Sequence, residues 1–526
     1  MYDALIIGAG HNGLVCGTVL ARAGMEVLIV EANDEAGGCI WTETLPSGHR
    51  IERGAIDHGA ILPLVDELGL SEFGLEYMFR EVVVGAGFGD GTTLLFHQDL
   101  GVTLEAIATH APADVAGYEE MSRVSSHLLE MMGTFDRPPS LADLSSFGAN
   151  LATDPLWLLL TSADKAIGRY VTDDHLRSAI AMYGAHGQLP PWLPGTGLFG
   201  LLLPAVHGKR VGRPKGGSQA LTMALEAALR GAGGALRTGT PICRIDNAEG
   251  GGVATTADGE GIPAHNIVST IDVAITTALF ESPPAALTRV AQAVTSGALN
   301  VAELKVDLAL SEPASPGFDG DPAALWLLQE HPDSLRRSFA QLISGEMPDD
   351  PCMMWAAPSA LDSTAAPSGQ GTVWLSAFVP ARPRTYEWDA EAEQAAGEWL
   401  LDGFARITGR DLRPSVVDMR VTGPASWERR IGSRYGNPNH IDLTIDQLFT
   451  WRPPTTHPYR TDLPWLYLSG AGTHPGGGLS GIPGRNAARA VLADAAGYRG
   501  RRRRWKDDLS AMREGWRLFR ALRKTS

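Results

Sequence analysis

The first 31 residues form a complete β-α-β pattern, and this pattern limits the possible folds more than any other feature. Residues 2–7 are an apolar run typical of a buried parallel strand, and residues 14–23 have helical spacing. Residues 25–30 are a second apolar strand, which ends at Glu31. The sequence G-A-G-H-N-G at residues 8–13 therefore stands between strand and helix, as a dinucleotide-binding turn requires. We predict a Rossmann-type nucleotide site here.

The residue types in this turn match the needs of a bound pyrophosphate. Gly8 permits the tight turn, Gly10 lets the backbone approach the phosphates, and Gly13 lets the helix pack closely on the strand. The helix N-terminus then points at the phosphates, and the acid at the end of the second strand can accept hydrogen bonds from ribose hydroxyls. The predicted contacts are Gly8, Gly10, His11, Asn12, Gly13 and Glu31.

A glycine doublet and a second glycine loop indicate which dinucleotide binds. Nicotinamide dehydrogenases do not need the doublet Gly37-Gly38, whereas many flavoproteins place such a doublet near the pyrophosphate and ribityl chain of FAD. Near the far end, a strand at 465–469 leads into the amide-rich loop 470–478, and residue 481 opens a helix. The dipole of that helix can stabilise a reduced flavin. We predict FAD, with further contacts from Gly37, Gly38, Gly472, Gly481 and Ile482.

Two other glycine clusters lack the strand-turn-helix context. Residues 85–91 stand between two strands and predict a hairpin. Residues 231–234 follow a helix and predict its C-cap. With one nucleotide fingerprint, the electrons are expected to leave through oxygen, a quinone or another diffusible acceptor.

Composition excludes several other classes of protein. The 4 cysteines form no C-x-x-C, which excludes a disulfide framework, a zinc ribbon and a dithiol centre. No spacing of histidines and carboxylates indicates a metal, so none is expected. The tail, residues 498–526, contributes +8 to a net charge of −16, so the rest carries −24, which argues against a nucleic-acid partner. Without an apolar run near about 18 residues, we expect a cytoplasmic location.

These motifs resemble the phytoene-desaturase family of FAD oxidoreductases, and within it a branch named for a pyridine nucleotide-disulfide oxidoreductase domain. The matching segments are residues 8–14, 214–221, 442–449, 451–453 and 470–484. They are spread along nearly the whole chain, and the G-x-G-T-H-P-G-G-G loop is the most specific of them. The lack of C-x-x-C argues against the disulfide chemistry in the branch's name.

The resemblance implies an α/β (α+β overall) architecture. An FAD-binding domain of the glutathione-reductase/amine-oxidase type would be assembled from discontinuous segments, beside a mixed substrate domain. We place the FAD-binding domain at 1–95, 206–285 and 455–497, and the substrate domain at 96–205 and 286–454. Ile242 stands where such proteins hold adenine with backbone groups, although an ordinary core strand is the alternative.

The resemblance also implies that flavin N5 accepts a hydride, while the protein supplies orientation and electrostatics. A base that removes the adjacent proton would complete a C=C bond. His474, in the terminal glycine loop, and Asp57-His58 are the polar candidates. The alternatives are a positional role for His474, a structural role for Asp57 and a bystander role for His58.

The predicted activity is that of an FAD-dependent dehydrogenase or desaturase acting on a mostly apolar small molecule. An amine oxidase, a redox-neutral double-bond isomerase and a flavin-stabilised binding protein are the alternatives. Product mass separates desaturation from isomerisation, because isomerisation leaves mass unchanged.

The tail combines basic residues with an apolar stripe. Residues 501–504 are arginines, and the residues after them repeat an apolar side chain every three or four positions. The stripe consists of Trp505, Leu509, Met512, Trp516 and Phe519. A basic amphipathic helix of this kind can lie on an anionic membrane surface. The alternative is that the stripe packs on the enzyme body or on a partner subunit.

Overall fold

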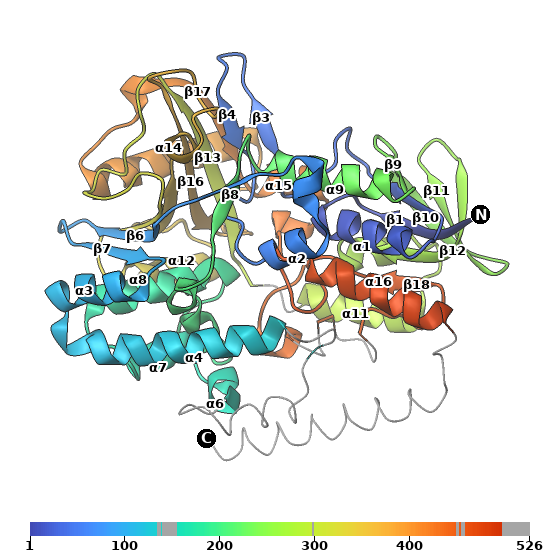
Figure 1. Ribbon diagram of the computed structural model, residues 1–526, viewed down its shortest axis with the longest axis horizontal. Helices are drawn as coiled ribbons and strands as arrows, with labels where there is room; N and C mark the ends of the chain where they lie inside the picture. Colours follow the sequence, from blue (N-terminus) through green and yellow to red (C-terminus); the bar gives the residue numbers. More distant parts are fainter. Residues whose placement is uncertain (134–137, 139–154, 297–298, 449–451, 454–457, 497–526) are drawn as a thin grey trace.

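Two seven-stranded sheets lie side by side, each with its own core (Figure 1). The computed structural model describes residues 1–133, 138, 155–296, 299–448, 452–453 and 458–496. Within these ranges, no helix has both the length and the apolar character needed to cross a membrane. The tail, residues 498–526, lies outside the described residues, so its membrane or subunit contact stays a prediction.

The first sheet contains both strands of the N-terminal β-α-β pattern. Its order is β10-β11-β12-β1-β2-β9, and β18 pairs with the second half of β12. The pairs β1·β2, β1·β12, β2·β9 and β12·β18 are parallel. The strands are β1 (Tyr2–Ile7), β2 (Val27–Val30), β9 (Ala235–Arg237), β10 (Ile242–Ala248), β11 (Gly251–Thr256), β12 (Gly261–Ser269) and β18 (Leu466–Leu468).

Both faces of this sheet are covered by helices. Side chains alternate between the faces along a strand, so Ala4 and Ile6 enter one core while Leu5 and Ile7 enter the other. Three helices cover the first face: α1 (His11–Arg22), α9 (Gln219–Gly231) and α16 (Ile482–Ala495). Two lie on the second face: α10 (Val273–Ala278) and α11 (Ala285–Ser296). The near-continuous apolar runs in β1 and β2 follow from this double burial.

The parallel strands end at one edge of the sheet, where the predicted motifs meet. Gly8 follows β1, Glu31 follows β2, and Thr270 follows β12. The hydroxyl of Thr270 donates to the carbonyl oxygen of Gly8 at 3.0 Å. Ligands of open parallel sheets bind outside the carboxyl ends of the strands. The fold therefore puts the glycine turn at the edge where a nucleotide is expected.

The second sheet has the order β17-β13-β16-β15-β14-β6-β7. It is antiparallel except where β6 pairs with β14. Its strands are β6 (Val82–Phe88), β7 (Thr93–His97), β13 (Ala302–Leu310), β14 (Leu325–Gln329), β15 (Met353–Ala356), β16 (Gly371–Val379) and β17 (Val416–Thr422).

The two faces of β13 differ in polarity. Leu304 and Val306 pack in one apolar core with Phe404 of α14 (Ala390–Thr408). The opposite face carries Glu303, Lys305 and Asp307, and it is turned toward the first domain. Buried Lys305 donates to Asp307 and to the backbone oxygen of Glu52, which follows the glycine doublet in sequence. This contact connects the two domains at the edge of the candidate site.

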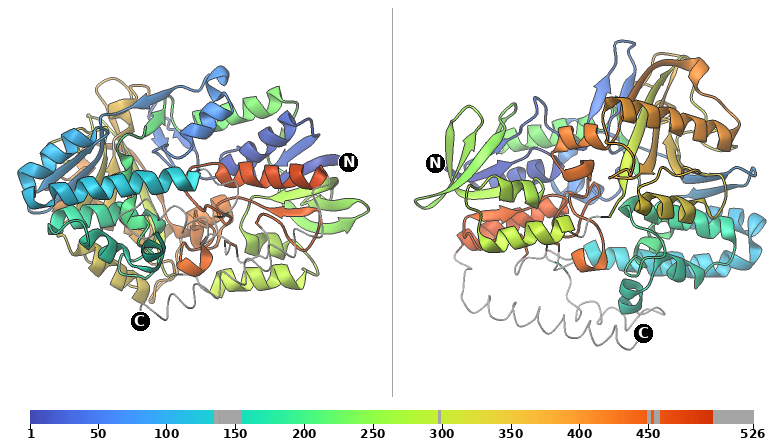
Figure 2. Two further views of the ribbon diagram at one scale, coloured as in Figure 1. Left: turned by 60° about the horizontal axis from the view of Figure 1, so that its bottom comes forward. Right: turned by 180° about the vertical axis from the view of Figure 1, so that it is seen from behind.

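A helical layer packs beside one end of the second sheet (Figure 2), and there are two further two-stranded sheets. The helices are α3 (Leu100–His110), α4 (Val115–Gly133), α6 (Pro155–Leu160), α7 (Ala163–Gly168), α8 (Asp174–Gly184) and α12 (Ser334–Ser344). The small sheets pair β3 (Thr42–Thr44) with β4 (Arg50–Glu52), and β5 (Tyr77–Phe79) with β8 (Gly212–Pro214). The remaining helices are α2 (Leu62–Glu67), α13 (Pro358–Leu361) and α15 (Pro424–Ile431).

Two predicted domain boundaries differ from the structure. We predicted that residues 1–95 belong to the FAD-binding domain, but β6 and β7 pair within the second sheet. We also began the second substrate-domain segment at residue 286, whereas α11 packs in the core of the first sheet. The hairpin predicted around residues 85–91 is confirmed by the antiparallel β6·β7 pair. The helix end predicted near residue 231 is confirmed by α9.

Candidate cofactor and active site

In the glycine turn after β1, contacts within the protein explain why Gly8 and Gly13 are glycines, but they do not explain Gly10. A Cβ at Gly13 would lie 2.0 Å from the carbonyl oxygen of Gly8, and Gly8 has φ +100°. Gly10, in contrast, has φ −66°, and apart from its chain neighbours no described residue has an atom within 4 Å of the position that its Cβ would take. The open space beside Gly10 is where the sequence predicts that pyrophosphate approaches the backbone.

Glu31 braces this turn from the neighbouring strand. One carboxylate oxygen accepts from the backbone N–H of Ala9 at 2.8 Å. The other accepts from the backbone N–H of Asn33 at 3.0 Å and from its side-chain amide at 2.7 Å. The oxygen that accepts from Ala9 has a second lone-pair site, so it can still accept from a ribose hydroxyl. The sequence predicted only the ribose contact, and the structure adds the bracing role.

The glycine doublet lies directly against the nucleotide turn. Gly37 forms an isolated β-bridge with Gly10, and its N–H donates to the carbonyl oxygen of Ala9 at 3.0 Å. Gly37 has φ +133° and Gly38 has φ +59°, and residues other than glycine rarely adopt these backbone angles. The structure thus brings together two motifs that the sequence separates by more than twenty residues.

The N-terminus of α16 lies beside the same glycine turn, although α16 is far from it in sequence. Its N-cap is Gly481 and its first residue is Ile482, whose N–H donates to Ser480 Oγ at 3.3 Å. Neither Gly10 before α1 nor Gly481 before α16 supplies a side-chain cap. Two helix N-termini therefore converge beside the open space, and their dipoles favour a bound anion.

The other two predicted cofactor contacts lie at the rim of this arrangement. Ile242 begins β10, two residues after Thr240, whose N–H donates to the carbonyl oxygen of Glu31 at 2.7 Å. Gly472 lies in the buried glycine loop, and its Cβ position is 3.4 Å from the Cβ of His440. Both residues are thus close to segments that carry the nucleotide motifs.

His474 is buried in the terminal glycine loop. Its backbone N–H donates to the carbonyl oxygen of Arg452 at 3.2 Å, and its own carbonyl oxygen accepts from the Tyr459 hydroxyl at 2.9 Å. Burial lowers the pKa of His474 to about 3, and the charge of Arg452 adds to this shift. His474 is therefore neutral at pH 7. It can accept or donate a hydrogen bond, but it carries no charge.

Asp57 is held between two arginines. Its carboxylate accepts from Arg80 Nη1 at 2.9 Å, from Arg80 Nη2 at 2.5 Å and from Arg213 Nε at 2.8 Å. Burial would raise the pKa of Asp57, but the two guanidinium groups outweigh it and hold that pKa below its usual range. A carboxylate so strongly ion-paired is a poor proton acceptor. The geometry favours the structural alternative for Asp57.

His58 is likewise held by hydrogen bonds on both ring nitrogens. Ser218 Oγ donates to the carbonyl oxygen of Ala55 at 2.8 Å, so this hydroxyl accepts from His58 Nε2 at 3.2 Å. The Tyr77 hydroxyl then donates to His58 Nδ1 at 2.8 Å. Burial lowers the pKa of His58 to about 3. His58 is a neutral residue that fixes neighbouring loops, and its catalytic role stays a prediction.

Two further histidines near the glycine turn are also neutral. Burial lowers the pKa of His11 to about 4, and proximity to His440 contributes. Burial lowers the pKa of His440 to about 4, and the charge of Arg452 contributes. Arg452 itself donates to the carbonyl oxygens of Asp442 at 2.7 Å and Asn439 at 2.8 Å. Its charge is thus turned toward backbone dipoles.

Two arginines that no sequence motif indicated lie against the ring of Trp41. The guanidinium carbon of Arg430 lies 4.2 Å from the Trp41 ring centroid, and that of Arg53 lies 5.2 Å from it. Buried guanidinium nitrogens on both arginines lack a hydrogen-bond partner among the described residues. Burial lowers the pKa of Arg430, whereas the charges of Glu31 and other nearby groups raise it. Arg53 is ion-paired with Glu43 at 3.6 Å, so Arg430, with its unpartnered nitrogens, is the cation that fits a phosphate-bearing ligand.

No sequence motif indicated Glu303 either. Its charge influences the pKa of two residues, Cys39 and His186. Burial raises the pKa of Cys39, next to the doublet, to about 12, and Glu303 adds to this effect. Burial lowers the pKa of His186, after α8, while Glu303 opposes that change. The His186 side chain is nevertheless exposed to solvent. Charged residues at alternate positions of one strand, Glu303, Lys305 and Asp307, were the available sequence signal.

A parallel sheet with a glycine turn, an acid on the second strand, a glycine doublet and a second helix N-terminus defines a two-domain flavoprotein oxidoreductase. Residues 13–492 match the family model described as flavin containing amine oxidoreductase, and the chain belongs to this family. It is an FAD-dependent oxidoreductase of the phytoene desaturase-like branch. The predicted cofactor, FAD, is confirmed.

Individual relatives cover nearly the whole chain. Pyridine nucleotide-disulfide oxidoreductase domain-containing protein 2 of Rattus norvegicus is 26% identical, with 94% of each chain covered. Hydroxyneurosporene desaturase of Cereibacter sphaeroides is 27% identical, covering 94% of this chain and 98% of its own. The structure of cyclohexylamine oxidase from Brevibacterium oxydans matches with a TM-score of 0.58 at 17% identity, covering 94% of this chain and 99% of that one. This last similarity shows the shared fold.

Proposed function

We propose that this oxidoreductase removes a hydride from a mostly apolar small molecule and forms a carbon–carbon double bond in it. The observation that carries the proposal is the charge state of the candidate site. His11, His58, His440 and His474 are all neutral at pH 7, because burial lowers each pKa to about 4 or below. Such a site offers shape and hydrogen bonds, and it suits a substrate without charge.

The residues that we assign to the cofactor surround the open space beside Gly10. We assign the diphosphate of FAD to the open space beside Gly10, next to the N-termini of α1 and α16. Arg430 supplies positive charge from the substrate domain. Its guanidinium group lies over Trp41, and two of its nitrogens lack a hydrogen-bond partner among the described residues. Glu31 takes the ribose hydroxyls. We assign His474 a positional role near the flavin.

The proton chemistry is assigned to Glu303. Bound FAD supplies a hydride acceptor. When a hydride leaves one substrate carbon, the adjacent C–H must give up its proton for the double bond to form. One oxygen of Glu303 accepts from Ser376 Oγ at 2.5 Å, which fixes the carboxylate and leaves its other oxygen for the substrate proton. Glu303 suits this role better than Asp57, because no arginine pairs with it among the described residues.

The names of relatives support a hydrocarbon-like substrate. One relative is named hydroxyneurosporene desaturase, and its similarity extends over 94% of this chain. A second candidate function is amine oxidation, in which the hydride leaves a carbon beside nitrogen. The fold shared with cyclohexylamine oxidase favours it, as do Trp374 and Phe378, aromatic residues on the same sheet face as Glu303.

The test is anaerobic reduction of the FAD-loaded protein by a panel of substrates. The panel contains a linear polyene, a cyclic terpene and cyclohexylamine, and flavin bleaching is followed for each. We expect bleaching by a terpenoid, with a product that has lost two hydrogens. Bleaching by the amine alone would assign the protein to the second candidate function. A terpenoid product of unchanged mass would indicate isomerisation, and no turnover with any compound would indicate a binding protein.

A further inference from the structure

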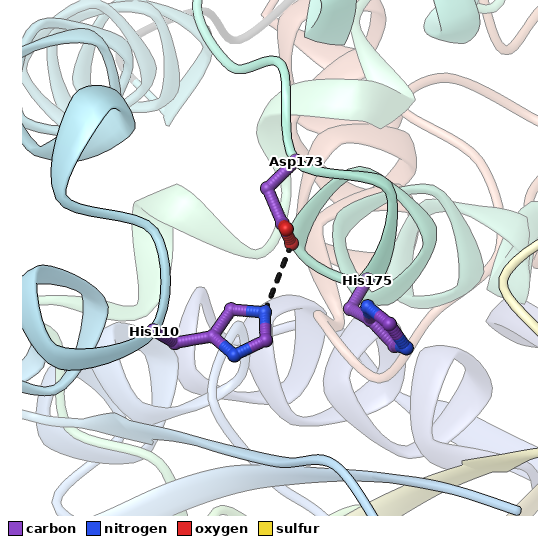
Figure 3. A group of neighbouring side chains, drawn as sticks. All are labelled: His110, Asp173 and His175. Atoms are coloured by element: carbon purple, nitrogen blue, oxygen red, sulfur yellow. Dashed lines mark hydrogen bonds and ion pairs between the residues drawn. The ribbon is translucent and has the colours of Figure 1, made fainter. Parts of the chain in front are cut away.

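Outside the candidate flavin site, two histidines and one carboxylate meet in the substrate domain (Figure 3), and a second carboxylate binds one of the histidines. His110 is the last residue of α3, and Asp173 is the N-cap of α8. His175 is in the first turn of α8, and Asp90 is in the turn between β6 and β7. Asp90 and His110 are distant in sequence from Asp173 and His175, so no spacing indicated the group.

The arrangement has the dimensions of a metal site. One donor atom from each of His110, Asp173 and His175 lies within 4.8 Å of the other two. His110 Nε2 is 3.1 Å from Asp173 Oδ1, and Figure 3 shows its ring pointing at that carboxylate. Zinc binds imidazole nitrogen and carboxylate oxygen at about 2.0–2.2 Å, which puts tetrahedral donors about 3.4 Å apart. Only small side-chain rotations are needed to close the site.

Outer residues already hold the donors in place. Asp90 Oδ2 lies 2.9 Å from His175 Nε2, so Nδ1 is the nitrogen of His175 that a metal would take. A carboxylate that binds the outer nitrogen of a histidine is the usual support of a metal ligand. Buried Asp114 accepts from the backbone N–H of Asp173 at 2.7 Å and fixes that residue. Solvent reaches the donors, because 20–28% of each donor side chain is exposed.

We propose that His110, Asp173 and His175 bind one Zn²⁺, with water as the fourth ligand and Asp90 as the outer support of His175. The metal ties the end of α3 to the start of α8. The far end of α8 leads to Tyr183 and His186 beside the candidate active site. Bound zinc therefore stabilises the helical layer, and it takes no part in the redox chemistry.

The test uses the FAD-loaded protein after treatment with a chelator. Zinc chloride is titrated calorimetrically, bound zinc is counted, and thermal unfolding is recorded with and without the metal. We expect one zinc per chain and a higher unfolding temperature with zinc, because a ligand that binds the native state stabilises it. The flavin spectrum should not change.

Asp173→Asn is the decisive variant, because asparagine also caps helices well and removes the ligand charge without removing the cap. We expect it to unfold as the parent does without zinc, but to bind zinc at least ten-fold more weakly. His175→Gln should behave similarly, and His265→Gln, on the first sheet, is the matched control. Absence of zinc uptake by the parent would overturn the proposal. Undiminished uptake by both Asp173→Asn and His175→Gln would also overturn it.

Discussion

Asn12 and Gly484 are in direct contact, although Asn12 is in the first turn of α1 and Gly484 is in the first turn of α16, the last described helix. The N–H of Gly484 donates to Asn12 Oδ1 at 3.3 Å, and a Cβ at residue 484 would lie 2.1 Å from the backbone oxygen of Asn12. This contact fixes the N-termini of α1 and α16 relative to each other. The anion site that they form therefore depends on both ends of the chain.

Gly484→Ala should push the two helix N-termini apart. Overpacking against rigid backbone costs about 1–3 kcal/mol of unfolding free energy, and FAD affinity should fall together with stability. Denaturant unfolding of apoprotein and flavin titration measure the two effects. Gly168→Ala is the control, because its added Cβ meets only the Arg177 side chain, at 3.5 Å. Equal stability and affinity in the two variants would refute the helix contact as a constraint.

Arg430→Gln should weaken FAD binding while leaving the fold intact. A charge-assisted hydrogen bond is worth about 1.5–3 kcal/mol, so the dissociation constant should rise at least about ten-fold. Arg429→Gln is the matched control, since Arg429 is exposed on the same helix. Flavin fluorescence on titration of the apoproteins measures the affinity. If both variants bind FAD as tightly as the parent, Arg430 does not contact the phosphates.

Glu303→Gln should slow flavin reduction without changing cofactor content. Loss of a general base typically costs about 10²–10⁴-fold in rate, and glutamine keeps the hydrogen bond from Ser376. Anaerobic stopped-flow reduction with a reactive substrate measures this rate. Glu312→Gln, at an exposed position just beyond β13, controls for the loss of charge. A parent-like rate in Glu303→Gln would assign proton removal to another group.

His58 should make the protein less stable as the pH falls below neutrality. Its pKa is about 3 in the folded protein and about 6.5 in the unfolded chain, so between these values the unfolded chain binds one more proton. The stabilising contribution is complete above pH 6.5 and is lost as the pH falls toward 3. His58→Gln should reduce the slope of unfolding free energy by about 1.4 kcal/mol per pH unit near pH 5. Denaturant unfolding from pH 4.5 to 7.5 checks this, and identical slopes would show that His58 is protonated when folded.

The nucleotide end of the fold was predictable because its constraints are local. Gly8, Gly13 and Glu31 act within one β-α-β unit, where spacing alone determines geometry. The doublet was also predictable, since Gly37 has a backbone conformation that favours glycine. These motifs predicted both the cofactor and the class of enzyme.

The remaining site residues depend on long-range packing that sequence patterns do not encode. Arg430 contacts Trp41, which is far from it in sequence. The orientation of Glu303 depends on β13, whose polar face contacts the backbone of Glu52 through Lys305. The boundary near residue 95 was wrong because β6 pairs with the distant strand β14. The structural role of Asp57 could not be predicted, because its partners Arg80 and Arg213 are distant in sequence.

The most direct test of the cofactor site is the FAD content of Gly10→Val. Apart from the chain neighbours of Gly10, no atom of the described residues lies within 4 Å of its Cβ position. The φ of −66° suits any residue, so the apoprotein should fold normally. The valine side chain would occupy the space that we assign to the diphosphate. We predict a folded, colourless protein with parent-like circular dichroism, whereas Gly168→Ala stays yellow. A Gly10→Val protein that purifies with a full complement of FAD would contradict the proposed site.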